Sequence, residues 1–103
     1  MTVENMRSPR TGAKVANQFI IRDRYKEIFQ SYESTIAEID HDNRTITIGR
    51  DWDYSATTSK YRNEFFDDFG FSELASKQGL RKAMEKCLCT SDVGVKYKVV
   101  FEA

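Results

Sequence analysis

The sequence predicts an α+β domain in which two helices pack on one face of an antiparallel sheet of about five strands, arranged as two hairpins plus a C-terminal strand. Residues 44–48 alternate polar and apolar side chains, which is typical of a strand with one buried face. Tyr61, Phe65 and Phe69 recur at every fourth position, which indicates an amphipathic helix with an aromatic inner face. The chain closes with a second alternating run at residues 93–101.

The length and composition favour one domain. A chain of 103 residues that is 40% hydrophobic supports a single modest core and no further module. Residues 1–13 are polar and include the one proline, so we expect a flexible N-terminal arm there and a single domain over residues 14–103. Residues 1–10 lack the apolar segment of a signal peptide, and no apolar run approaches the roughly 18 residues that span a bilayer. We therefore expect a cytoplasmic protein without membrane contact.

Two hairpins are expected ahead of the helices. The first joins residues 15–21 to residues 25–30 through Asp23 and Arg24. The second joins residues 35–39 to residues 44–48 across a turn of sequence DHDN, which contains the one histidine of the chain, His41. These are residue types that bind metals, but their position between two strands favours a turn, and we expect no metal or other cofactor.

The helical region has two expected parts. The first helix covers residues 58–69 and ends at Gly70. A second region follows Ser72, which can cap it. Its expected buried face consists of Leu80, Ala83, Met84, Cys87 and Leu88. Because Gly79 weakens a helix interior by about 1 kcal/mol relative to alanine, we expect a break near Ser76.

The two cysteines, Cys87 and Cys89, are too close in sequence for an ordinary disulfide, and we expect reduced, partly buried thiols. The sequence also lacks a nucleophile-elbow pattern, and its carboxylates do not by spacing alone define a shared cleft. We therefore expect a protein that is not an enzyme.

Charge is distributed unevenly although 16 basic and 16 acidic residues cancel. Residues 1–30 carry six basic and three acidic residues, a net charge of +3, and residues 76–103 carry the same numbers. Residues 31–75 carry four basic and ten acidic residues, a net charge of −6. A pI of about 6.6 is well below the value above about 9 that is typical of a general nucleic-acid binder.

The first helix has charges that oppose its dipole, with Lys60 and Arg62 near its start and Asp67 and Asp68 near its end. Free backbone N–H groups, hydroxyls and cations at a helix start form a typical anion site. The candidate anion-binding residues are Ser55, Thr57, Thr58, Ser59, Lys60 and Arg62. In the alternative interpretation the hydroxyls only cap the helix, while the two cations pair with Asp51 or Asp53.

Two phrases carry a resemblance to a known family. Residues 31–37 read SYESTIA, and residues 52–61 read WDYSATTSKY. Together they resemble small phage- and prophage-encoded proteins of uncharacterised function, in which a serine–tyrosine phrase precedes a phrase of the form YSxTTS. The likeness extends over about residues 7–66. The histidine that often ends the second phrase is Tyr61 here. The resemblance implies a phage or mobile-element origin.

The leading functional hypothesis is a small phage-type accessory protein that binds a host protein and inhibits it or a defence complex, as anti-CRISPR proteins do. Interfaces favour aromatic anchors, and the candidates are Trp52, Tyr54 and Phe71. The acidic segment at residues 31–75 would suit a basic nucleic-acid channel of the partner.

Two other functions remain open from the sequence. One is a module for a phosphate ligand, a nucleotide or a nucleic acid, which would use Thr57 to Lys60 with Arg22, Arg24 and Arg50 nearby. The other is an oligomeric virion or structural component, or a homodimer, in which an edge strand at residues 95–101 pairs with another copy.

Overall fold

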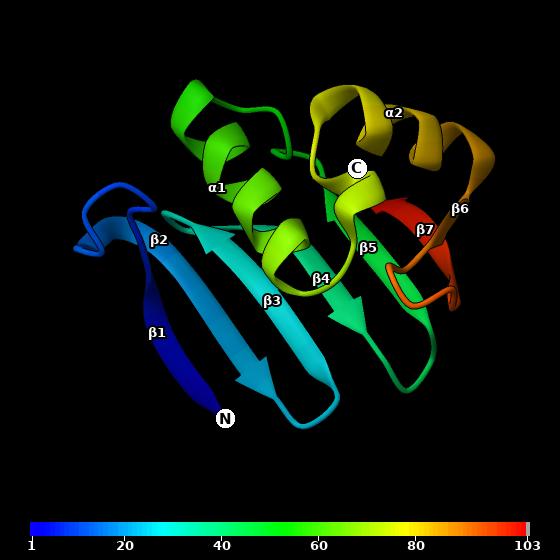
Figure 1. The fold of residues 1–103 in the computed structure, drawn as a ribbon, viewed down its shortest axis with the longest axis horizontal. Helices are drawn as coiled ribbons and strands as arrows, with labels where there is room; N and C mark the ends of the chain where they lie inside the picture. The colour runs from blue at the N-terminus through cyan, green and yellow to red at the C-terminus, as the bar shows by residue number, and fades with distance from the viewer. Residues whose placement is uncertain (103) are drawn as a thin grey trace.

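A computed structural model describes residues 1–102 and shows an α+β fold with helices on one side of a sheet (Figure 1). The strands are β1 (Thr2–Arg7), β2 (Lys14–Asp23), β3 (Lys26–Ser31), β4 (Ser34–Asp40), β5 (Thr45–Gly49), β6 (Leu88–Thr90) and β7 (Lys96–Glu102). The helices are α1 (Ala56–Asp68), the short 3₁₀ helix η1 (Ser72–Leu74) and α2 (Lys77–Lys86). Within residues 1–102 no helix is long and apolar enough to cross a membrane.

The sheet has seven strands in the order β1-β2-β3-β4-β5-β7-β6 and is mixed, which corrects the expected antiparallel sheet of about five strands. Strands β5 and β7 are parallel, because the chain between them crosses the sheet through α1 and α2 before it returns. The other neighbouring pairs are antiparallel. Strand β7 lies between β5 and β6 and is therefore not the edge strand expected at residues 95–101, although β6 pairs only with its residues 96–98.

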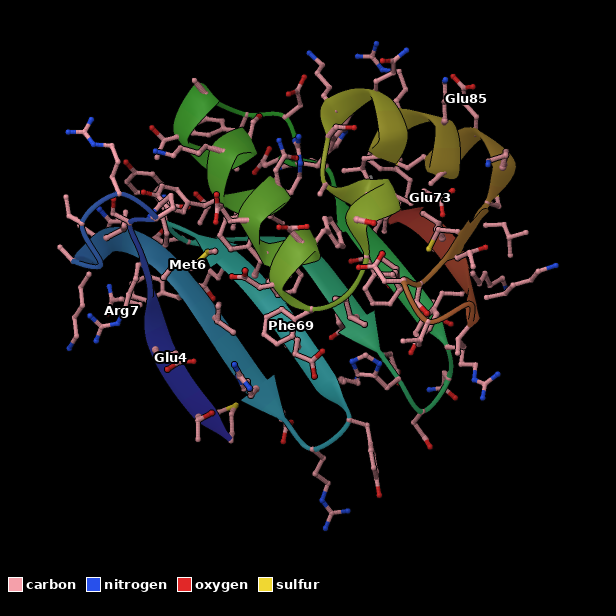
Figure 2. The ribbon with its side chains drawn as sticks, in the orientation of Figure 1. Glu4, Met6, Arg7, Phe69, Glu73 and Glu85 are labelled. Carbon is pink, nitrogen blue, oxygen red and sulfur yellow. The ribbon has the colours of Figure 1, made fainter. Side chains whose placement is uncertain are left out.

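The expected N-terminal arm is also corrected, because residues 2–7 form the edge strand β1. This strand pairs with β2 from Thr2↔Arg22 to Asn5↔Phe19, and Met6 is buried. Glu4 and Arg7, labelled in Figure 2, lie on this outer strand. An edge strand needs few apolar residues, which explains why its sequence resembled a polar arm.

The two expected hairpins and the helix are confirmed. Strands β2 and β3 pair with each other, as do β4 and β5, and His41 lies in the turn after β4. Helix α1 begins two residues earlier than expected, at Ala56, and Ser55 is its N-cap. Gly70 follows the helix with a φ of +85°, as expected for a residue that ends a helix in the left-handed region.

The core forms where α1 packs on the centre of the sheet. Phe65 is fully buried, and its ring stacks on that of Phe29 in β3 with centroids 5.8 Å apart. Phe66 packs against the edge of the Phe65 ring. At the end of α1, Phe69, labelled in Figure 2, is partly buried. The guanidinium of Arg22 lies 5.0 Å from the centroid of the Phe69 ring. The aromatic face of α1 therefore fixes the helix across β2 and β3.

The buried face of α2 is shorter than expected. Leu80 and Ala83 are buried and Met84 is partly buried, but Cys87 and Leu88 are exposed. The helix ends at Lys86, Cys87 adopts a φ of +58°, and Leu88 begins β6. Both cysteines are free thiols in the structure.

Of the two thiols, that of Cys89 lies in the core. Burial is the main reason that its pKa is raised to about 12, and the negative charge of Glu73 adds to the effect. This thiol therefore stays protonated at neutral pH, which makes it a poor nucleophile.

The break between η1 and α2 is confirmed, but its cause differs from the expected one. Ser76 is the N-cap of α2, and its Oγ accepts a hydrogen bond from the Gly79 N–H at 3.0 Å. A Cβ on Gly79 would lie 2.1 Å from the carbonyl oxygen of Glu73. Gly79 therefore allows η1 to pack closely against the first turn of α2.

We expect Gly79→Ala to lower the free energy of unfolding by about 1–3 kcal/mol, because the added methyl group overlaps the Glu73 carbonyl. At a helix position without this contact, the same change raises stability by about 1 kcal/mol. Urea denaturation followed by circular dichroism measures the difference. Gln78→Ala, at the exposed neighbouring position, is the control and should stay within about 0.5 kcal/mol of wild type. A more stable Gly79→Ala protein would contradict the packing argument.

Candidate functional site

Two hydroxyl groups at the start of α1, those of Ser55 and Thr58, point inward rather than toward a ligand. Thr58 is fully buried, and its Oγ1 lies 2.9 Å from Ser31 Oγ and 3.1 Å from Ser55 Oγ. Ser55 Oγ also accepts a hydrogen bond from the Thr58 N–H. These hydroxyls cap the helix and attach it to β3.

Arg62 is fully buried and acts as a structural brace. One guanidinium nitrogen donates to the carbonyl oxygen of Trp52 at 2.5 Å, and the other donates to Asn63 Oδ1 at 3.1 Å. The guanidinium carbon lies 5.2 Å from the centroid of the Trp52 ring. Burial lowers the pKa of Arg62, and the carboxylate of Asp53, 3.9 Å away, opposes this shift. The side chain therefore holds the segment before α1 in place.

The carboxylate of Asp53 interacts with polar groups at the place where the sequence predicted a bound anion. Its Oδ1 accepts a hydrogen bond from Ser59 Oγ at 3.2 Å, and its Oδ2 lies 2.8 Å from Lys77 Nζ. Thr57 is exposed, and exposed Lys60 lies over the ring of its neighbour Tyr61. The structure thus does not bring the six candidate residues together as an anion site. The alternative interpretation, in which the cations at the start of the helix pair with Asp51 or Asp53, is confirmed for Arg62, which pairs with Asp53.

The three candidate interface aromatics have different surroundings. Phe71 is buried, and its ring packs edge-on against Tyr97 with centroids 4.8 Å apart, so its proposed role as an exposed anchor is wrong. Trp52 is partly buried between the core and Arg62. Tyr54 is 69% exposed.

A cavity of about 460 Å³ lies beside the start of α1, next to Tyr54. It is formed by β2, the β3–β4 turn, the start of β4 and the segment that follows β5. The residues that line it are Asn17, Ser31, Tyr32, Glu33, Ser34, Ile36, Asp51 and Tyr54. The two phrases that carry the sequence resemblance, residues 31–37 and 52–61, therefore meet at this cavity. We refer to it below as the tyrosine cavity.

Hydrogen bonds fix both sides of the tyrosine cavity. The N–H of Tyr32 donates to the carbonyl oxygen of Asn17 at 2.7 Å, and both residues have positive φ values, 55° and 64°. On the other side, Ser34 Oγ donates to Asp51 Oδ2 at 2.9 Å, and the N–H of Tyr54 donates to the Asp51 carbonyl oxygen at 3.1 Å. Asn tolerates positive φ, whereas a bulky aromatic residue adopts it at a cost.

The tyrosine cavity is acidic. Its lining residues include Glu33 and Asp51, and none of them is Lys, Arg or His. Arg50 lies 4.0 Å from Asp51 Oδ1, but its side chain is 76% exposed, so solvent screens this pair and it contributes little. The sequence predicted a basic site for an anion at the start of α1, whereas the pocket beside it in the structure is acidic. The signals for this pocket in the sequence were the acidic middle segment, Tyr32 in the first phrase and Tyr54 in the second.

A second polar cluster joins Glu27, His41 and Tyr97. His41 Nδ1 lies 2.7 Å from Tyr97 Oη, and His41 Nε2 lies 2.5 Å from Glu27 Oε1. Burial is the main cause of the raised pKa of Tyr97. Because both ring nitrogens of His41 have protein partners, this cluster acts to connect the β4–β5 turn to β3 and β7.

A family model covers most of this chain. The DUF8033 family, a family of unknown function, matches residues 1–82. The chain belongs to this family. The match includes every residue that lines the tyrosine cavity. Comparisons with curated proteins and with solved structures found no match.

We expect Arg62→Ala to lower the free energy of unfolding by about 3 kcal/mol or more, because it removes a fully buried side chain together with its hydrogen bond to the Trp52 carbonyl. Lys60→Ala should change stability by less than about 0.5 kcal/mol, because Lys60 is exposed. Urea denaturation measures both variants. Comparable losses of stability in the two variants would contradict a structural role for Arg62 that Lys60 lacks. A shift of the backbone amide signals of residues 57–60 on addition of phosphate would also contradict it, because it would indicate an anion site.

We also expect stability to fall below about pH 4. The pKa values of three carboxyls lie below the ordinary value of 3.8: Asp40 through hydrogen bonds from Asn43, Asp53 mainly through Lys77, and Asp92 through hydrogen bonds from Ser72. A carboxyl with a lowered pKa stabilises the folded state above its unfolded pKa, and this contribution is lost as pH falls through the folded pKa.

Urea denaturation over a series of acidic pH values measures this loss. Asp92→Asn removes one titrating group but keeps an oxygen that can accept from Ser72, so its stability should depend less steeply on pH than that of wild type. An unchanged slope would show that Asp92 does not contribute.

Proposed function

We propose that this chain acts by binding a protein partner through the surface around the tyrosine cavity. The observation that supports this is the pair of exposed tyrosines at the cavity, Tyr32 at 52% and Tyr54 at 69% exposure. Tyrosine is enriched at protein interfaces, where it supplies apolar area and a hydroxyl group together. Two exposed rings beside one cavity fit such an interface.

The backbone at Tyr32 supports the same role. With φ at 55°, this position in the β3–β4 turn suits glycine or asparagine, and an aromatic side chain there costs about 1 kcal/mol. The ring is half exposed, so it does not regain this cost through full burial. A binding function gives a reason for a large ring at this position.

The partner we propose is a host protein or defence complex, which makes the chain a phage-type accessory protein. This part of the proposal rests on the resemblance of residues 31–37 and 52–61 to phage-encoded proteins. The acidic lining of the cavity, which includes Glu33 and Asp51 and no Lys, Arg or His, supports a basic partner surface, such as a nucleic-acid channel.

The nucleic-acid alternative receives less support. Ser31, at the end of β3, contacts Thr58 of α1, whereas Arg24 lies in the turn before β3 begins. A six-residue strand is about 17–20 Å long, so Arg24 lies far from the start of the helix. Arg22 pairs with Glu4, and Arg50 lies beside Asp51. The cations of that hypothesis are therefore not gathered at one place.

A homodimer is a second candidate because β1 is an edge strand. Its outer side has no paired strand within residues 1–102, and Val3 is 59% exposed. Such an edge can pair with a second copy. Light scattering during size-exclusion chromatography tests this candidate separately from the tyrosine cavity.

We expect Tyr32→Gly to raise the free energy of unfolding by about 0.5–1 kcal/mol, because glycine adopts a positive φ without the steric cost. The same change should weaken capture of the host partner, as should Tyr54→Ala, since each removes an exposed ring. Affinity capture from host lysate with quantitative mass spectrometry measures binding, and urea denaturation measures stability.

The matched control is Tyr25→Ala. Tyr25 is 60% exposed but lies in the turn between β2 and β3, at the other end of β3. Its replacement should leave capture unchanged. If Tyr32→Gly and Tyr54→Ala capture the same proteins as wild type in the same amounts, binding does not use the tyrosine cavity and the proposed function is wrong.

A further inference from the structure

We infer that the tyrosine cavity receives the guanidinium group of an arginine side chain presented by the partner protein. This inference rests on the proposed function and specifies its chemistry. Two features of the cavity carry it: two acidic residues in its lining, Glu33 and Asp51, and two exposed tyrosines, Tyr32 and Tyr54.

The cavity combines the two interactions that a guanidinium group makes best. A cation gains energy over the face of an aromatic ring, and arginine does so more often than lysine. A carboxylate accepts parallel hydrogen bonds from the planar fork of nitrogens that arginine presents. Glu33 and Asp51 supply acceptors, while Tyr32 and Tyr54 supply rings at the same cavity. An anionic ligand would meet two negative charges here.

Asp51 and the backbone of Tyr32, two parts of the cavity wall, are held in place by hydrogen bonds within the protein. Asp51 has its carboxylate bonded to Ser34 and its carbonyl bonded to the N–H of Tyr54. Tyr32 is attached through its backbone to Asn17. Groups that are fixed before binding lose less conformational freedom when the ligand arrives.

The size of the cavity is compatible with a long side chain. Its volume of about 460 Å³ lies in the usual range of 300–1,000 Å³ for ligand pockets. The exposed side chains of Tyr32 and Tyr54 offer apolar surface for the methylene groups of the arginine side chain. A flexible arginine can thus place its apolar stem in the cavity and its charged end at the carboxylates.

The test uses three short peptides that are blocked at both ends and have the sequence Gly-Xaa-Gly, where Xaa is arginine, citrulline or lysine. Citrulline has nearly the same shape as arginine but no charge. The peptides are titrated into the ¹⁵N-labelled full chain. We expect the arginine peptide to shift the amides of Tyr32, Glu33, Asp51 and Tyr54, with affinity at least about tenfold higher than for citrulline and higher than for lysine.

Variants of the carboxylates test the contacts. Glu33→Gln and Asp51→Asn should each weaken the arginine peptide by about threefold to tenfold, since a neutral amide replaces a charged acceptor. In Asp51→Asn the side chain keeps an oxygen to accept from Ser34, so the fold is preserved. Glu85→Gln and Asp67→Asn remove the same charge at exposed positions outside the cavity and should not change the affinity. The ¹H–¹⁵N spectrum of each variant reports its folding.

The inference is overturned if the arginine peptide shifts none of the cavity amides, if citrulline binds as well as arginine, or if the control variants lose as much affinity as the cavity variants. These results are separate from those of the proposed function. If Tyr54→Ala loses host-protein capture but the wild-type chain does not bind the arginine peptide, the proposed function stands and arginine is rejected as the ligand. If the wild-type chain binds the arginine peptide but Tyr54→Ala captures host proteins as wild type does, the arginine site stands and the proposed function is rejected.

Discussion

The packing of the aromatic face of α1 on the centre of the sheet is the interaction on which the rest of the structure depends. The stack of Phe65 on Phe29 fixes the helix over β3, and both rings are fully buried, which contributes to the hydrophobic free energy of the fold. With the helix in this position, Thr58 meets Ser31 at the end of β3. The start of α1 and the β3–β4 turn are therefore brought together by the core.

Arg62 attaches the segment before the helix to α1 and thereby to the core. Because its guanidinium is buried and donates to the Trp52 carbonyl, residues 52–54 cannot move independently of α1. Tyr54 then lies beside Asp51, which Ser34 holds from β4. The tyrosine cavity is thus a consequence of where the helix packs, although its walls come from four separate segments of the chain.

The sequence was sufficient to predict the parts of the fold that local patterns specify. Alternation at residues 44–48 and the aromatic spacing of α1 identified a strand and a helix, because each element buries one face. Strands β1 and β6 were missed because edge strands carry little apolar pattern. The parallel pairing of β5 with β7 depends on a long crossover that local spacing does not encode. The site was misread for a similar reason, since the inward direction of Arg62 depends on where α1 packs.

The position of Arg62 near the start of α1, one part of the unfavourable order of charges on this helix, follows from its buried contacts. A cation near the start of a helix opposes the helix dipole, but here it replaces solvent contacts with hydrogen bonds to the Trp52 carbonyl and to Asn63, beside the carboxylate of Asp53. Asp53 is in turn engaged by Lys77. The carboxylate two residues earlier, Asp51, faces the cavity instead. The two acidic residues therefore have different roles. Asp53 compensates the charge of the buried Arg62, and Asp51 contributes negative charge to the surface of the cavity.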